Sequence, residues 1–133
     1  MSTFLEKSQQ NLDAGDLLIK SGLPNASVHC SYYATVQFML HIIFKKLGIT
    51  KDEFDTDRRY NKEGTHTWAE KLVSNELIKK SREDYKWYKS KFPELKRIRE
   101  SADYSELGIT RDMGIDALNR SQTLINTLNS NFK

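Results

Sequence analysis

Residues 25–48 read NASVHCSYYATVQFMLHIIFKKLG, and this segment decides how the rest of the chain must fold. Apolar side chains recur in it every three or four residues, at Val28, Tyr32, Val36, Met39, Leu40, Ile43 and Leu47. Four more apolar residues widen that surface, namely Tyr33, Phe38, Ile42 and Phe44. A helix that is apolar on most sides is buried by its neighbours. We therefore expect a central helix that begins at the cap Asn25 and runs to about Gly48.

Amphipathic segments with helix-start signals lie on both sides of this central helix. The residues expected to cap them are Thr3, Thr67, Ser81 and Thr110. Pro93 lies inside the fourth helix and should kink it or begin a new segment. Three of the connections are short, which favours antiparallel neighbours. The expected fold is an all-α, up-and-down bundle of four long helices plus a shorter one, forming a single domain over residues 1–133.

One segment between the predicted helices is charged and has no clear apolar period. Residues 50–65 read TKDEFDTDRRYNKEGT. Loops of this length are uncommon and often functional or disordered. We interpret this segment as a long, mobile loop within the domain.

Composition limits the class of protein. The chain has 133 residues, 38% of them hydrophobic and 29% charged, which is typical of a soluble globular domain. The single cysteine, Cys30, excludes an internal disulfide and a cysteine-based zinc site. No secretory signal and no membrane span is recognisable, so we expect a cytoplasmic protein. No phosphate-binding glycine loop and no metal-ligand spacing occurs, so we expect neither a cofactor nor a metal ion.

The net charge of +3 is small, but the basic residues are unevenly distributed. Residues 79–99 hold nine of the 21 lysines and arginines, at Lys79, Lys80, Arg82, Lys86, Lys89, Lys91, Lys96, Arg97 and Arg99. Such a run is either the solvated face of a helix or a surface for phosphate groups, because clustered cations bind polyanions.

The end of this run, LKRIRESADY at Leu95–Tyr104, combines charged and phenolic side chains within about three helical turns. Arg97 and Arg99 could hold phosphate through paired hydrogen bonds. Asp103 lies four residues after Arg99, so the two could simply pair along the helix. Tyr104 is a poor base at neutral pH but could stack on a nucleobase or donate to phosphate.

Three elements of the sequence together resemble the HEPN domain, the higher eukaryote and prokaryote nucleotide-binding family. They are Ser31-Tyr-Tyr-Ala34, His66 at the start of the third helix, and Arg99-Glu-Ser-Ala-Asp-Tyr104. The resemblance covers nearly the whole chain and implies a helical bundle that forms homodimers. It also implies a nucleotidyltransferase-type partner, or a role in toxin–antitoxin or other defence systems. Many members are metal-independent ribonucleases with an Arg-x(4–6)-His motif in a late helix.

The sequence departs from that ribonuclease motif. Tyr104 stands where the motif has histidine, and no histidine follows His66. Arg59 and His66 have the right separation, but they bracket the charged segment and do not lie in a late helix. We therefore expect no confident catalytic residue, although Arg99, Tyr104 and His66 are the candidates.

Three roles remain open for these residues. Asp103 and Tyr104 could join the fourth helix to the second through Tyr32 or Tyr33. The preferred function is a non-catalytic module that binds nucleotide or RNA, or pairs with a nucleotidyltransferase-type protein. The expected binding residues are Arg97, Arg99, Asp103, Tyr104, Tyr32 and Tyr33. The alternative is a metal-independent ribonuclease toxin that uses Arg99 and Tyr104.

A homodimer is also predicted. The central helix and the aromatic-rich stretch from Tyr85 to Phe92 offer more apolar surface than a small bundle easily buries.

Overall fold

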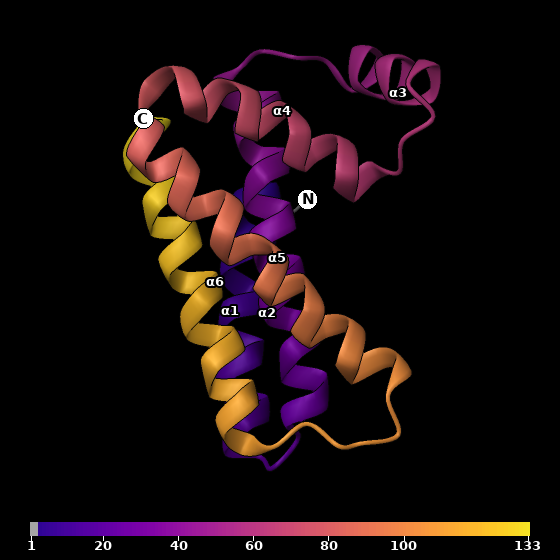
Figure 1. Ribbon diagram of the computed structural model, residues 1–133, viewed down its shortest axis with the longest axis vertical. Helices are drawn as coiled ribbons and strands as arrows, with labels where there is room; N and C mark the ends of the chain where they lie inside the picture. The colour runs from indigo at the N-terminus through magenta and orange to yellow at the C-terminus, as the bar shows by residue number, and fades with distance from the viewer. Residues whose placement is uncertain (1–2) are drawn as a thin grey trace.

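The computed structural model describes residues 3–133, and all the regular secondary structure in that range is helical (Figure 1). The elements are α1 (Phe4–Lys20), α2 (Pro24–His41) with a π-helical continuation (Ile42–Lys46), α3 (Lys51–Tyr60), α4 (Thr65–Lys80), α5 (Arg82–Tyr104) and α6 (Arg111–Asn131). The all-α prediction is confirmed. The described part of the chain has six α-helices, one more than the sequence predicted, because α3 forms within the expected loop.

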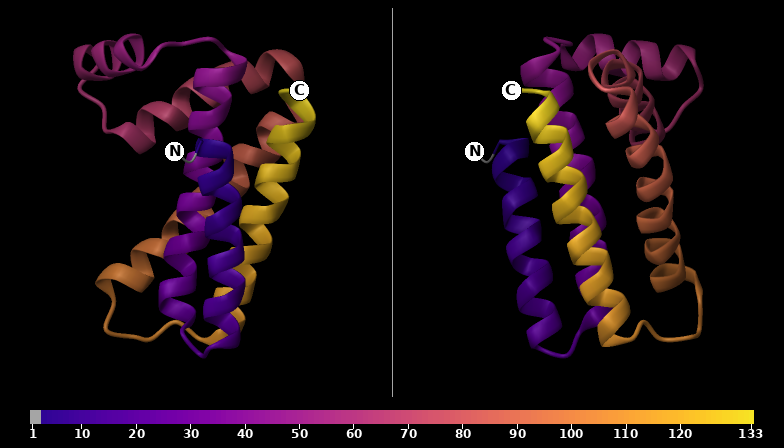
Figure 2. Two further views of the ribbon diagram at one scale, coloured as in Figure 1. Left: turned by 180° about the vertical axis from the view of Figure 1, so that it is seen from behind. Right: turned by 60° about the vertical axis from the view of Figure 1, so that its left-hand side comes forward.

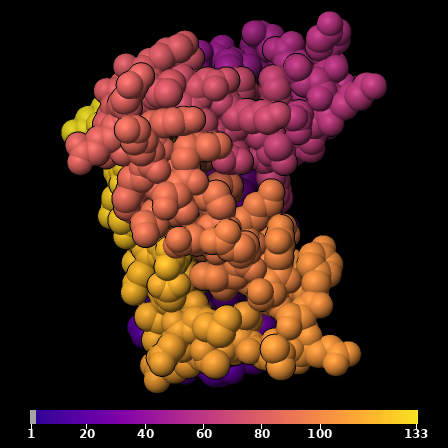
Figure 3. All heavy atoms as spheres, in the orientation of Figure 1, coloured from indigo at the N-terminus to yellow at the C-terminus, as the bar shows by residue number. Residues whose placement is uncertain are grey.

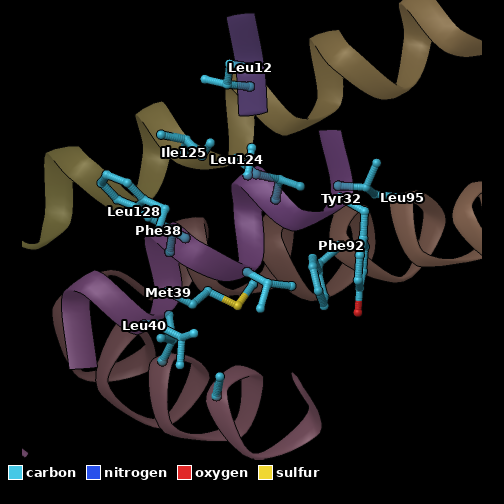
Figure 4. Close-up of a cluster of buried hydrophobic side chains, with 14 of the residues drawn as sticks. Leu12, Tyr32, Phe38, Met39, Leu40, Phe92, Leu95, Leu124, Ile125 and Leu128 are labelled. Carbon is cyan, nitrogen blue, oxygen red and sulfur yellow. The ribbon is translucent and has the colours of Figure 1, made fainter. Parts of the chain in front are cut away.

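Helix α2 is the centre of the bundle, as its apolar sequence predicts. It packs against α1, α4, α5 and α6. Figures 1 and 2 show α1, α2 and α6 running along the long axis, while α4 lies across the upper end. Side chains of α1, α2, α5 and α6 meet in the core drawn in Figure 4, among them Leu12, Phe38, Leu95 and Leu128.

Three of the predicted helix caps are confirmed. The hydroxyls of Thr3, Ser81 and Thr110 each accept a backbone N–H three residues on, at 3.1, 3.1 and 3.2 Å. The prediction that Asn25 caps the second helix was wrong. Helix α2 begins at Pro24, since proline suits the first helical position. The Asn25 amide instead donates to the backbone oxygen of Ala102 at 2.9 Å, which ties the start of α2 to the end of α5.

The prediction of a loop over residues 50–65 was also wrong for most of that segment. Helix α3 is capped by Thr50, whose hydroxyl accepts the backbone N–H of Glu53 at 3.1 Å. Its one buried residue, Phe54, packs edge-on against Phe44. The helix has a single apolar anchor and an otherwise charged surface, so it carries no apolar period to reveal it.

Two further boundaries differ from the prediction. Helix α4 begins at Thr65, after Gly64, and not at the expected cap Thr67. This places His66 within the first turn of α4. Helix α5 runs through Pro93 as one element, with Phe92 and Leu95 buried on either side of the proline. Packing of this helix against the core offsets the backbone hydrogen bond that proline cannot make.

Two residues of the aromatic stretch of α5, Tyr88 and Phe92, face the interior of their own chain, whereas Tyr85 and Trp87 are partly buried. Tyr88 and Phe92 are 0% and 2% exposed, so they offer no surface to a partner. This removes part of the argument for a dimer, which stays a prediction. Among residues 3–133, no helix combines the length and apolar character that crossing a membrane requires.

Candidate functional site

A pocket opens where the start of α4 approaches the second half of α5. We call it the Arg99 pocket, and its volume is about 360 Å³. Figure 3 shows the surface indented between the magenta atoms of α4 and the orange atoms of α5. The residues that line the pocket come from three elements and the turn before α4: Tyr32, Gly64, Thr65, His66, Thr67, Lys96 and Arg99.

The lining of the Arg99 pocket supplies hydrogen-bond donors. Lys96 and Arg99 are cations, and the hydroxyls of Tyr32, Thr65 and Thr67 can each donate. The first backbone N–H groups of α4 have no partner within the helix and carry the positive end of its dipole. Among the described residues that line the pocket, none carries a carboxylate. This chemistry fits an anion.

Arg99 is held in place by contacts on two sides. Its guanidinium lies 4.5 Å from the centre of the Tyr32 ring, which is a cation–π contact. Its Nη1 is 3.4 Å from the Asp103 Oδ2. The Nε of Arg99 is buried and has no hydrogen-bond partner among residues 3–133. The side chain is therefore positioned before any ligand arrives, with donor capacity left over.

The position of Tyr32 depends in turn on the core. Its ring stacks on Phe92 at 5.9 Å between centroids, and Phe92 stacks on Tyr88 at 5.8 Å. We call these three residues the aromatic stack. Burial raises the pKa of Tyr32, so the phenol stays protonated and can donate. Figure 4 shows Tyr32 and Phe92 within the buried cluster.

His66 lies against Tyr32 at the edge of the pocket. The Tyr32 hydroxyl is 3.3 Å from Nδ1 of His66, and Tyr33 meets the imidazole edge-on. Burial lowers the pKa of His66, and the nearby Arg99 and Lys96 cations lower it further. The imidazole is therefore neutral at pH 7. The Tyr32 hydroxyl and Nδ1 can share this hydrogen bond in either direction, because the direction depends on which imidazole nitrogen carries the proton.

His29 extends the same face of α2 by one turn. Its Nε2 is 2.6 Å from Oδ1 of Asp103, so this carboxylate contacts both His29 and Arg99. Sequence reasoning missed His29 as a site residue. The available signal was its spacing, since it precedes Tyr32 and Tyr33 by three and four residues and thus shares their face.

A second hollow lies beside Arg99, and we call it the Tyr104 depression. Its volume is about 620 Å³, and its lining comes from the end of α5: Arg97, Arg99, Glu100, Ser101, Tyr104 and Ser105. Tyr104 is 82% exposed there. The expected contact of Asp103 and Tyr104 with Tyr32 or Tyr33 was therefore wrong. Asp103 reaches α2 through His29, and Tyr104 faces solvent.

Most of the predicted site residues thus fall into two groups that meet at Arg99, while Tyr33 and Asp103 line neither hollow. Tyr32, His66 and Arg99 come together in the Arg99 pocket, although nothing in the sequence placed His66 near Arg99. Arg97 and Tyr104 line the Tyr104 depression. Sequence reasoning did not assign Lys96 to the site, although its position three residues before Arg99 places the two on one helix face.

The fold and the site together define an all-α bundle with a donor-lined pocket at the junction of α2, α4 and α5. Comparison of the chain with protein-family models, curated proteins and solved structures found no match.

Proposed function

We propose that this protein is a non-catalytic helical module that binds RNA or a nucleotide through a phosphate group held in the Arg99 pocket. The observation that carries the proposal is the lining of that pocket, in which two cations and several donors converge without a carboxylate. The resemblance to the HEPN domain supports the same class of ligand.

Phosphate is the anion that best suits this arrangement. A guanidinium with free N–H groups can donate to two phosphate oxygens at once, whereas Lys96 adds a point charge. The lysines toward the start of α5 add little to this site, because Lys89 pairs with Glu70 at 3.3 Å and Lys91 lines a separate hollow with Arg120.

Binding of a fluorescein-labelled RNA oligonucleotide at low salt tests the proposal. We expect the affinity to fall as salt rises, because bound phosphates release counterions. Arg99→Ala and Lys96→Ala should each weaken binding, by about tenfold to a hundredfold for Arg99 since a charge-assisted pair contributes about 1.5–3 kcal/mol.

The matched control is Arg82→Ala, which removes an exposed arginine from the other end of the same helix. The two positions are 17 residues apart, or about 25 Å along the axis. Arg82→Ala should leave the affinity nearly unchanged. Absence of any salt-sensitive binding would contradict the proposal and leave association with a protein partner as the function to test.

A second candidate function, a metal-independent ribonuclease, is favoured by one arrangement of residues. His66 and Arg99 line the same pocket, so a neutral imidazole stands beside a cation that could hold the scissile phosphate. The imidazole would take the proton of the 2′-hydroxyl, while Arg99 would stabilise the negative charge on the oxygens of the scissile phosphate. Tyr104 lies in the other hollow and would not act as the base.

Cleavage of total cellular RNA in the presence of EDTA tests this candidate. A ribonuclease should lose activity in His66→Asn and in Arg99→Ala while keeping it in His41→Asn. Intact RNA after prolonged incubation with folded protein would exclude it and favour the binding module.

A further inference from the structure

We infer that the Tyr104 depression is the base-binding half of a two-part site for single-stranded RNA. In this site the Arg99 pocket takes a phosphate and the Tyr104 ring stacks on the adjoining nucleobase. The inference rests on the proposed function, because it names the form of nucleic acid that the same site would accept.

The first argument is that the two hollows adjoin. Arg99 lines both of them, so the two hollows share this side chain. Arg99 and Tyr104 are five residues apart, which is about 7.5 Å along the helix axis and about 140° around it. A nucleotide that reaches both side chains would therefore curve around α5 within the Tyr104 depression, which both residues line.

The second argument comes from the charges of the two hollows. The described lining of the Arg99 pocket has no carboxylate, whereas Glu100 lines the Tyr104 depression. A carboxylate repels phosphate but accepts hydrogen bonds from the N–H groups at the edge of a base. Phosphate therefore belongs in the Arg99 pocket, and a base belongs beside Glu100.

The third argument is the aromatic surface of Tyr104. The side chain is 82% exposed and lies among Arg97, Arg99 and Glu100. Exposure alone does not make a site, since Tyr60 on α3 is 86% exposed but lines neither the Arg99 pocket nor the Tyr104 depression. An exposed ring next to cations is the arrangement that proteins use to stack bases of single strands. Bases in a duplex are already stacked on each other and cannot reach such a ring.

The experiment compares the affinity of the full chain for a fluorescein-labelled, ten-nucleotide RNA and for the same RNA annealed to its complement. Fluorescence anisotropy at one fixed salt concentration gives both values. We expect the single strand to bind more tightly. Tyr104→Ser should weaken single-strand binding by about tenfold, because one stacked base is lost. Tyr104→Trp should retain binding, and Tyr60→Ser should not change it.

The outcomes separate this inference from the proposed function. If Arg99→Ala weakens binding but Tyr104→Ser does not, the phosphate site stands and base stacking is overturned. If neither variant changes binding, the proposed function itself fails. Equal affinity for duplex and single strand would also overturn the inference. A change from dimer to monomer in Tyr104→Ser, measured by sedimentation, would overturn it by assigning Tyr104 to an interface between copies of the chain.

Discussion

The two halves of α5 both carry aromatic residues, but these residues have different roles in each half. Its first half turns Tyr88 and Phe92 into the core, where they are 0% and 2% exposed. Its second half keeps Leu95 and Ala102 inside but presents Arg97, Lys96, Arg99 and Tyr104 at the two hollows. An aromatic side chain near one end of this helix therefore holds the fold together, whereas one near the other end is free to meet a ligand.

The two halves are nevertheless connected. Phe92 stacks on Tyr32, and Tyr32 lies under the Arg99 guanidinium. The aromatic stack thus positions the cation that defines the binding half. We expect substitutions of the buried aromatic residues in the first half to change both stability and binding, and substitution of the exposed Tyr104 in the second half to change binding alone.

The largest expected effect follows from truncating the stack. Phe92→Ala should lower the free energy of unfolding by about 3–5 kcal/mol, since it leaves a cavity in the core and removes the ring beneath Tyr32. Urea denaturation followed by circular dichroism measures this change. In buffer without urea, where the variant is still folded, it should also bind RNA more weakly.

Tyr104→Ala is the control for that experiment on the same helix. Its side chain is exposed, so the free energy of unfolding should change by less than about 0.5 kcal/mol. Equal destabilisation by the two substitutions would contradict the division of α5 into a structural half and a binding half.

The next effect is the pH dependence of His66. Its pKa in the folded chain is lowered by burial and by Arg99 and Lys96, whereas in the unfolded chain it is about 6.5. As the pH falls, the unfolded state therefore binds a proton before the folded state does. The contribution of His66 to the free energy of unfolding is present above about pH 6.5 and is lost as the pH falls below it. A bound phosphate favours the imidazolium, so RNA affinity should rise over the same interval.

Thermal unfolding and RNA anisotropy between pH 7.5 and pH 5.5 measure the two trends. His66→Asn should reduce both of them. His41 is a matched control, because burial, Lys46 and Lys45 lower its pKa, and it is not among the lining residues of the Arg99 pocket. His41→Asn should reduce the pH dependence of stability and leave that of affinity intact. An unchanged affinity profile in His66→Asn would place the phosphate elsewhere.

The smallest effect concerns His29, which shares Asp103 with Arg99. Removing the imidazole in His29→Ala should let the carboxylate move closer to Arg99 and compete with phosphate. RNA affinity should fall by a few-fold, and Asp103→Asn in the same background should restore it. A double-mutant cycle over the two positions measures this coupling. Independent, additive effects would mean that His29 has no part in positioning Asp103.

The features that could be predicted from the sequence were those with local signals. The apolar surface of residues 28–47 identified the central helix, and the caps Thr3, Ser81 and Thr110 identified three helix starts. Helix α3 escaped because its one buried side chain, Phe54, gives no period. Its capping signal, Thr50 followed by Glu53, was present in the sequence and would have revealed its start.

The site was only half predictable for the same reason. Arg99, Asp103 and Tyr104 share one short helical stretch, so their spacing could draw attention to it. His29 and His66 are remote in sequence from that stretch. No local pattern around either histidine predicts which residue of α5 it contacts or lies beside. Only the packing of α4 and α2 on α5 brings Asp103 to His29 and the Arg99 pocket to His66.

The sequence by itself determined an all-α chain with an apolar central helix, because helical periodicity and caps depend on neighbours three or four residues away. The tertiary structure alone decided that, of two arginines separated by one residue, Arg99 lines both hollows and Arg97 lines only the Tyr104 depression. It also decided that a histidine at the start of α4 lies beside Arg99 and stays neutral there. Those properties depend on burial and on charges from distant segments, which a local pattern does not encode.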